Sequence, residues 1–314
     1  KMSREVRTKS NLEKVLAAGQ FADTGELGPP RSANVEEVEE KAKHLLGNVD
    51  SVNITDNQTA VVRMSSMAAG LLLQKTGTEA NMQMVCRDRN RIAMQSDILG
   101  AAALGSNNLL VLSGAHQKYG YHPQAKNFFD IVSVNLIATI KMMPDERRLL
   151  SGQELPEGSA PRIFIGGAYN PFAVPEAYRV LRAAKKVEAG VDFLQSQCIY
   201  DMPRFKKFMA RAVDMGLTEK TYFMAGVTPL KSLGMAKYMK NNVPGITVPD
   251  ELIERMKGVE KDKQVDEGIK IACEQIEELK SMPGVAGVHL MLIEWEHMVP
   301  RMVEEAKIGP KYRK

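Results

Sequence analysis

The sequence predicts an α/β fold and, within that class, a single (β/α)8 TIM barrel. Short apolar runs alternate with amphipathic helical patterns along most of the chain, and eight such runs are present. Eight strands separated by helices are what a closed barrel of this kind requires. The alternative is an open doubly wound sheet, which favours a glycine-rich phosphate loop after an early strand. The sequence contains neither GxGxxG nor GxxxxGKS/T, so the barrel is favoured.

The first half of the chain supplies four strand–helix pairs. Strands are predicted at 20–26, 51–55, 82–86 and 108–112, and helices at 35–46, 61–75, 92–104 and 129–141. The first of these helices has acidic residues in its first half and basic ones toward its end, as the helix macrodipole favours. The run 108–112 is the clearest strand, because it is short, apolar and closed by Ser113 and Gly114.

The second half supplies the other four pairs. Strands are predicted at 162–166, 191–199, 222–227 and 285–293, and helices at 176–188, 203–215, 231–239 and 294–307. A long helical stretch at 249–281 precedes the last strand. No linker, repeat or low-complexity segment divides the chain, so residues 1–314 are predicted to form one domain, with a lead-in at 1–19 and a tail from about 305 to 314.

The charge pattern argues against a nucleic-acid partner. The chain has 42 basic and 38 acidic side chains mixed along its length, for a net charge of +4. A nucleic-acid-binding protein is expected to carry a concentrated basic face instead. The basic run 87–91 is too short for a nucleic-acid groove, and it fits an anion site or a solvated loop better.

Cysteine content and hydropathy favour a cytoplasmic protein. Cys86, Cys198 and Cys273 lie far apart and form no CxxC or His/Cys motif, so no metal site is expected. Sparse cysteines and no recognisable signal peptide are typical of a reducing compartment. No apolar run approaches the roughly 20 residues needed to span a bilayer, so no membrane association is expected.

The most informative local feature is an acidic residue at the end of the first predicted strand. Glu26 closes an apolar run, and Pro29-Pro30 then stop any further strand or helix, because proline fixes φ and lacks an N–H donor. Glu26 is therefore placed where a side chain can project into a cleft. The alternative for a single carboxylate in this position is a residue at the rim of a cleft with no catalytic role.

Polar residues also follow or interrupt most of the other predicted strands. Because active sites of (β/α)8 barrels lie at the C-terminal ends of the strands, these residues would line one mouth. The alternative is that they cap helices, which is equally expected for Thr55, Asp56 and Ser113 but less so for Gln197, since glutamine caps poorly. The residues are Thr55, Asp56, Asn57, Gln83, Cys86, Arg87, Asp88, Ser113, Gly114, Tyr169, Asn170, Gln195, Gln197, Thr228, Glu294 and Trp295.

Several short motifs occur in a fixed order along the chain. They are Glu26 with Pro29-Pro30-Arg31, Asn53-Ile54-Thr55-Asp56-Asn57, Met84-Val85-Cys86-Arg87-Asp88-Arg89-Asn90, His116-Gln117-Lys118-Tyr119-Gly120, Lys185-Lys186-Val187-Glu188-Ala189-Gly190, Gln197-Cys198-Ile199-Tyr200-Asp201 and Gly226-Val227-Thr228-Pro229. In order and spacing this set resembles the methylenetetrahydrofolate reductases, specifically the short flavoprotein subunit found in acetogens and related anaerobes. The resemblance extends from Gly25 to about Trp295.

The resemblance implies a TIM barrel that holds FMN at the strand ends, with the tetrahydrofolate substrate stacked on the flavin. The reaction would be the reduction of 5,10-methylenetetrahydrofolate to 5-methyltetrahydrofolate. Glu26 falls on the family's catalytic acid, which protonates a folate nitrogen as the bridged ring opens. Gln197, Met239 and Thr228 would contact the folate. The residues that would bind the flavin are Thr55, Gln83, Ser113, Gly114, His116, Tyr169 and Lys186, with Lys186 serving the phosphate.

One departure from the family pattern concerns the flavin. Where relatives read Gly-Asp-His-Gln after strand four, this chain reads Gly114-Ala115-His116-Gln117. The missing aspartate lies near the flavin ring, and the alanine side chain carries neither charge nor a hydrogen-bonding group. Three alternatives therefore stay open: a flavin-free hydride transferase, a folate- or corrinoid-linked methyltransferase, and a non-catalytic barrel subunit.

The resemblance also implies a source of electrons. Acetogen-type relatives commonly work with an iron–sulfur, cysteine-rich partner subunit, so a place in a larger redox complex is expected. NADH is the alternative donor.

Overall fold

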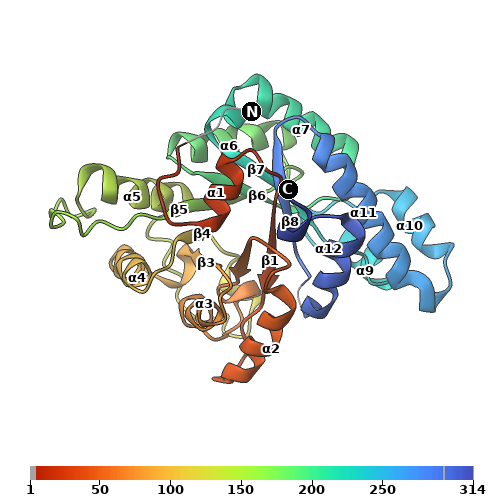
Figure 1. The fold of residues 1–314 in the computed structure, drawn as a ribbon, viewed down its shortest axis with the longest axis horizontal. Coiled ribbons are helices and arrows are strands. Elements are labelled where there is room, and N and C mark those ends of the chain that lie inside the picture. The colour runs from red at the N-terminus through yellow and green to blue at the C-terminus, as the bar shows by residue number, and fades with distance from the viewer. Residues whose placement is uncertain (1–4, 293, 314) are drawn as a thin grey trace.

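Eight parallel strands close into a barrel in the computed structural model, which describes residues 5–292 and 294–313. Each strand pairs with the next in the chain, and the last pairs with the first, with Thr24 opposite His289. The helices surround the ring of strands (Figure 1). The predicted (β/α)8 fold is therefore confirmed.

The strands lie close to their predicted positions. Strand β5 extends beyond its predicted end at Gly166, because that glycine accommodates an aromatic ring and does not stop the strand. A Cβ on Gly166 would lie 2.4 Å from Cζ of Phe193. Ile293, at the predicted end of the last strand, lies outside the described residues. The strands are β1 (Ala22–Leu27), β2 (Ser51–Ile54), β3 (Ala80–Val85), β4 (Asn108–Leu112), β5 (Phe164–Tyr169), β6 (Phe193–Cys198), β7 (Tyr222–Val227) and β8 (Val285–Leu290).

The helices depart from prediction in several places, among them the start of α5 at Ser133 and of α12 at Val299. The helix predicted at 61–75 begins at Ser66, where the side chain of Ser65 accepts a hydrogen bond from the Ala68 N–H and caps it. The predicted continuous helix at 249–281 is wrong, because α10 ends before Gly258. The outer helices are α2 (Val35–Leu45), α3 (Ser66–Lys75), α4 (Arg91–Ala103), α5 (Ser133–Glu146), α6 (Arg179–Glu188), α7 (Met202–Asp214), α8 (Leu217–Lys220), α9 (Leu233–Asn242), α10 (Asp250–Lys257), α11 (Gln264–Ser281) and α12 (Val299–Ala306).

The predicted lead-in contains a helix that the sequence reading missed. Helix α1 (Asn11–Ala17) buries Leu12 and Leu16 in one cluster with Phe193 and other inward side chains of the barrel. The carboxylate of Glu79 accepts hydrogen bonds from two backbone N–H groups at the start of α1, at 2.6 and 3.0 Å. The helix therefore closes the end of the barrel opposite the carboxyl ends of the strands.

The C-terminal tail is also fixed at that end. Arg313 binds the buried carboxylates of Asp23 and Asp50, and its Nε donates to the Phe21 carbonyl at 3.0 Å. Burial raises the pKa of Asp23, and the neighbouring Asp50 raises it further. The guanidinium is thus the cation that allows two adjacent carboxylates to be buried.

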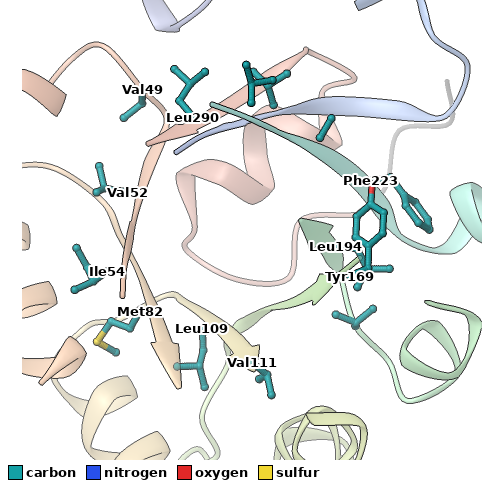
Figure 2. Packing of buried hydrophobic residues seen from close by; sticks show 14 of the residues in the cluster. Val49, Val52, Ile54, Met82, Leu109, Val111, Tyr169, Leu194, Phe223 and Leu290 are labelled. Atoms are coloured by element: carbon teal, nitrogen blue, oxygen red, sulfur yellow. The ribbon is translucent and has the colours of Figure 1, made fainter. Parts of the chain in front are cut away.

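The alternation of side chains along each strand separates two environments. Val52, Ile54, Met82, Leu109 and Phe223 point away from the ring of strands and pack beneath the helices (Figure 2). The positions between such residues point into the barrel, and many of them are polar near the carboxyl ends of the strands. Within the described residues, no helix is long and apolar enough to cross a membrane.

The closing role of α1 can be tested by removing one of its buried side chains. Leu12 is fully buried, so Leu12→Ala is expected to lower the free energy of unfolding by about 2–5 kcal/mol. Leu104 is 57% exposed, and the control Leu104→Ala should change it by no more than about 0.5 kcal/mol. Urea unfolding measures both. Equal, small effects would contradict the packing of α1 against the barrel.

Candidate active site

A pocket of about 770 Å³ opens at the carboxyl ends of the strands. The strand ends deliver the polar side chains, as expected for this fold, and α6 and α9 complete the walls. Among the residues predicted to act on the folate or the flavin, His116 lies outside this pocket, and so do Cys86, Asp88 and Glu294 of the strand-end residues expected to line the mouth. The structure brings together the other predicted residues: Glu26, Thr55, Gln83, Ser113, Gly114, Tyr169, Lys186, Gln197, Thr228 and Met239.

Glu26 is a buried carboxyl group at the end of β1. It is 5% exposed, and its Oε2 lies 3.1 Å from Nε2 of His289 on β8. The other ring nitrogen, Nδ1, lies 2.9 Å from Oγ1 of Thr24. The imidazole is therefore held through both of its ring nitrogens, and its contact with Oε2 fixes the orientation of the Glu26 carboxyl group. Oε1 of Glu26 stays outside this hydrogen bond.

His289 was missed by the sequence analysis. A single histidine in an apolar strand matches no motif, and its significance depends on the pairing of β8 with β1. The signal that the sequence offers is strand periodicity, because His289 lies two residues before Met291 within the predicted strand. Both residues line the pocket. Strand periodicity places both on the same face.

One wall of the pocket combines an amide with apolar side chains. Gln197 on β6 directs its Oε1 to the Cys198 N–H at 3.0 Å, which leaves Nε2 outside this bond. Thr228, after β7, has its hydroxyl 3.0 Å from the Cys198 thiol. Met239 and Trp295 are among the apolar residues of this wall. The wall suits a flat, largely apolar ligand with a polar edge.

A cationic group lies at another part of the pocket. Arg179, Arg182 and Lys186 are spaced three and four residues apart on α6, so they share one face of the helix. Lys186 is 9% exposed, and its Nζ donates to the Ala168 carbonyl. Burial, with the nearby Arg182, lowers the pKa of Lys186 to about 8. A bound anion would counter that loss of charge.

Thr55 presents a buried polar atom that a ligand could bind. Its side chain is 2% exposed and lines the pocket after β2. Among the described residues, its Oγ1 has no hydrogen-bond partner. Buried hydroxyl groups are normally paired, so a ligand in the pocket would supply the partner.

The remaining predicted flavin ligands differ in what they present to the pocket. Ser113 Oγ donates to the Ser133 hydroxyl at 3.1 Å. The ring of Tyr169 packs outside the strands beside Phe223 (Figure 2), and its hydroxyl donates to the Met224 carbonyl at 3.4 Å. Burial raises the pKa of Tyr169. A hydroxyl committed to the interior would not contact a ligand directly.

Gly114 and His116 lie on the loop after β4. Gly114 has φ of +87°, a conformation that glycine adopts readily. His116 is exposed, and its Nδ1 accepts a hydrogen bond from the Lys118 N–H at 3.2 Å. In this arrangement His116 shapes the loop and does not line the pocket.

The solvated-loop alternative for the basic run 87–91 is wrong for Arg87 and Arg89, which are largely buried in contacts within the protein. Arg87 is 2% exposed and donates to the Ala115 and Asn57 carbonyls at 2.9 and 3.1 Å. Arg89 pairs with Asp56 at 2.7 Å. The carboxylates that neutralise the run include partners remote in sequence, and the run braces the loops around the pocket mouth.

The described residues contain no group of three or more His, Cys, Asp or Glu side chains placed to hold a metal ion. The arrangement found instead is a buried carboxyl group, a cationic helix face and apolar side chains around one pocket. It defines a TIM barrel whose pocket has the chemical character of a binding site for an anionic organic ligand.

Comparison with known families identifies this class further. The sequence profile of methylenetetrahydrofolate reductase matches residues 11–307, so the chain belongs to the methylenetetrahydrofolate reductase family. A comparison with curated protein sequences finds no match.

Two solved structures are similar to this chain, and the first of them supports the fold. One is an uncharacterized protein from Clostridium thermocellum that binds two copies of 5-methyl-5,6,7,8-tetrahydrofolic acid. It is similar with a TM-score of 0.63 and 14% identity, covering 94% of this chain and 98% of that chain. Tryptophan synthase from Mycobacterium tuberculosis matches with a TM-score of 0.49 and 13% identity, covering 95% of this chain and 93% of that chain.

The bracing role of the basic run can be tested at its most buried ion pair. The Asp56 side chain is fully buried and that of Arg89 is 17% exposed. Arg89→Met would leave a buried carboxylate unpaired, and it is expected to lower the free energy of unfolding by about 3–5 kcal/mol. Adding Asp56→Asn should recover part of that loss in urea unfolding. A change below about 1 kcal/mol would instead match an exposed ion pair.

Proposed function

We propose that this protein reduces 5,10-methylenetetrahydrofolate to 5-methyltetrahydrofolate with FMN bound in the pocket. The observation that carries the proposal is Glu26, a buried carboxyl group at the pocket whose orientation is fixed by His289 at 3.1 Å. In this reaction a hydride adds to the methylene carbon, one carbon–nitrogen bond breaks, and that nitrogen takes a proton. Glu26 is the proton donor.

The pocket has features that fit FMN. The cationic face of α6, with Lys186 and Arg182, suits the phosphate. The unpartnered Thr55 hydroxyl and the Gln83 side chain suit polar atoms of the flavin. When bound, FMN supplies the hydride.

Ala115 is compatible with this arrangement through its backbone. The loop that carries it is held by Arg87, which donates to the Ala115 carbonyl at 2.9 Å. The course of the loop therefore does not depend on a carboxylate at position 115. The substitution would alter the charge near the flavin and, with it, the flavin's reduction potential.

The other pocket residues bind and orient the folate. Gln197 offers an amide edge for the polar part of the pterin, and Thr228 and Met239 lie on the same wall. The Clostridium thermocellum protein binds 5-methyl-5,6,7,8-tetrahydrofolic acid, which is the product of the proposed reaction, and this supports the assignment.

The proposed electron donor is an iron–sulfur, cysteine-rich partner subunit, with NADH as the alternative. The loop between β4 and α5 carries Tyr119 at 68%, Tyr121 at 68% and Phe128 at 54% exposure. Exposed aromatic side chains are enriched at protein interfaces. They follow β4 on the face of the barrel where the pocket opens, so a partner docked there would lie near the flavin.

The role of Glu26 is tested by a neutral, nearly isosteric replacement. Glu26→Gln keeps an acceptor for His289 but removes the transferable proton, so turnover should fall by about 10²–10⁴-fold. Binding of 5-methyltetrahydrofolate, followed by fluorescence quenching, should change little. Turnover is the reoxidation of reduced, FMN-loaded protein by methylenetetrahydrofolate.

Glu251→Gln is the matched control, because Glu251 is exposed on α10. It should behave as the wild type. Unchanged turnover in Glu26→Gln would exclude Glu26 as the acid. Methyl transfer to a corrinoid by protein that takes up no FMN would favour the methyltransferase alternative.

The charge of Lys186 predicts a pH dependence of FMN binding. Its pKa is lowered to about 8, so the ammonium form is present below that pH and is lost as the pH rises through it. The FMN dissociation constant should therefore be flat between about pH 7 and 7.5, where the phosphate is largely a dianion, and rise by up to about tenfold per unit above pH 8. Lys186→Arg keeps its charge and should remain flat to pH 9. If the wild type and Lys186→Arg showed the same dependence of the dissociation constant on pH, Lys186 would not be the residue that binds the phosphate.

A further inference from the structure

A row of buried polar side chains crosses the barrel interior below the pocket. Nδ2 of Asn81 on β3 donates to Oδ1 of Asn53 on β2 at 2.7 Å. Nδ2 of Asn53 donates to Oε1 of Gln195 on β6 at 2.6 Å, and Nε2 of Gln195 donates to Oγ1 of Thr24 on β1 at 3.0 Å. All four side chains are 3% exposed or less. The row is continuous from one side of the barrel to the other.

The row ends at the proposed acid. Thr24 Oγ1 lies 2.9 Å from Nδ1 of His289, and Nε2 of His289 lies 3.1 Å from Oε2 of Glu26. Asn53 belongs to a motif of the sequence analysis and Gln195 to its strand-end residues, and both line the pocket, whereas Asn81 and Thr24 were not singled out. Asn81 and Thr24 do not line the pocket formed by the described residues.

The direction of each hydrogen bond follows from the number of protons available. An amide nitrogen only donates, so Thr24 Oγ1 accepts from Nε2 of Gln195. The single proton of the buried hydroxyl then needs an acceptor, and Nδ1 of His289 at 2.9 Å supplies it. Nδ1 then carries no proton. A neutral imidazole has its proton on the other nitrogen, so Nε2 donates to Oε2 of Glu26.

The hydrogen-bonding state of Asn81, at the far end of the row, explains why the donors and acceptors of the row are not in the opposite order. In the observed direction, Oδ1 of Asn81 at the end of the row is a buried acceptor that has no hydrogen-bond partner among the described residues. Turning every amide over would instead leave the NH₂ group of Asn81, with two donors, unpaired at the same place. Buried unpaired acceptors are better tolerated than buried unpaired donors, so the observed direction is favoured.

We propose that Gln195, Asn53 and Asn81 are positioning residues that fix the tautomer of His289 through Thr24. Oε2 of Glu26 is thereby committed as an acceptor, and the proton that Glu26 transfers resides on Oε1. The effect of this tautomer on proton transfer by Glu26 rests on the proposed function, whereas the tautomer of His289 itself does not.

The tautomer can be measured without activity. In protein labelled with ¹⁵N at its histidines, the ring shifts of His289 distinguish protonated from unprotonated nitrogens, and His289→Gln assigns them among the five histidines of the chain. The wild type is expected to show Nε2 protonated and Nδ1 unprotonated. A protonated Nδ1 in the wild type at neutral pH would overturn the proposal.

Two variants test the source of the bias. Gln195→Met removes the donor to Thr24, and Thr24→Val removes the donor to Nδ1, so both should shift His289 toward the Nδ1-protonated tautomer. Gln197→Met is the matched control, because Gln197 lies on the same strand but outside the row, and it should leave the tautomer unchanged. An unchanged tautomer in both folded test variants would overturn the role of the row.

A kinetic measurement separates this proposal from the proposed function. Gln195→Met should lower kcat for methylenetetrahydrofolate reduction by about tenfold or more while changing the affinity for 5-methyltetrahydrofolate little, because the acid and not the binding wall is disturbed. A shifted tautomer with unchanged kcat would refute its catalytic meaning. If the wild type has no reductase activity but shows the expected tautomer, the proposed function fails and the positioning role stands.

Discussion

The contact between Glu26 and His289 depends on closure of the barrel. The two residues are 263 positions apart in sequence, and they meet because β1 pairs with β8 at the seam where the barrel closes. The carboxyl group is buried at that seam, so its position is set by the register of two strands and not by a flexible loop. The apolar cluster around the strands holds that register.

The interior of the barrel consists of layers that support the buried pair of Glu26 and His289. Helix α1 and large side chains such as Phe164 and Phe193 fill the end opposite the pocket. The polar row from Asn81 to His289 lies above them, and the pocket lies above the row. Unpaired polar groups in such a place are costly, so each layer supports the next: the packed end excludes water, and the row supplies partners for the buried polar groups.

The sequence predicted the fold well because buried parallel strands are short apolar runs that glycine and proline terminate. It missed α1, which is short, although Ser10 and Glu13 have the spacing of a capping box and Leu12 and Leu16 the spacing of a helix. It ended β5 at Gly166, since a glycine that fits around an aromatic ring looks the same in sequence as one that ends a strand. These errors concern contacts between segments far apart in the chain.

The difference between local sequence patterns and contacts of remote segments also explains which site residues the sequence predicted. Strand ends converge in any barrel of this kind, so the residues predicted there, Glu26 and Gln197 among them, were found from their positions. The significance of His289 depends on strand pairing. The basic run was misinterpreted because partners such as Asp56 are remote in sequence. His116 lies on an exposed loop whose course strand patterns do not determine.

The most direct test of the central claim is an anaerobic titration of the purified chain with FMN, followed by reduction and addition of methylenetetrahydrofolate. The account predicts uptake of one FMN per chain with a perturbed visible spectrum, and stoichiometric reoxidation of the reduced flavin as 5-methyltetrahydrofolate forms. A chain that takes up no FMN, or whose reduced flavin is not reoxidised by the folate, would contradict it.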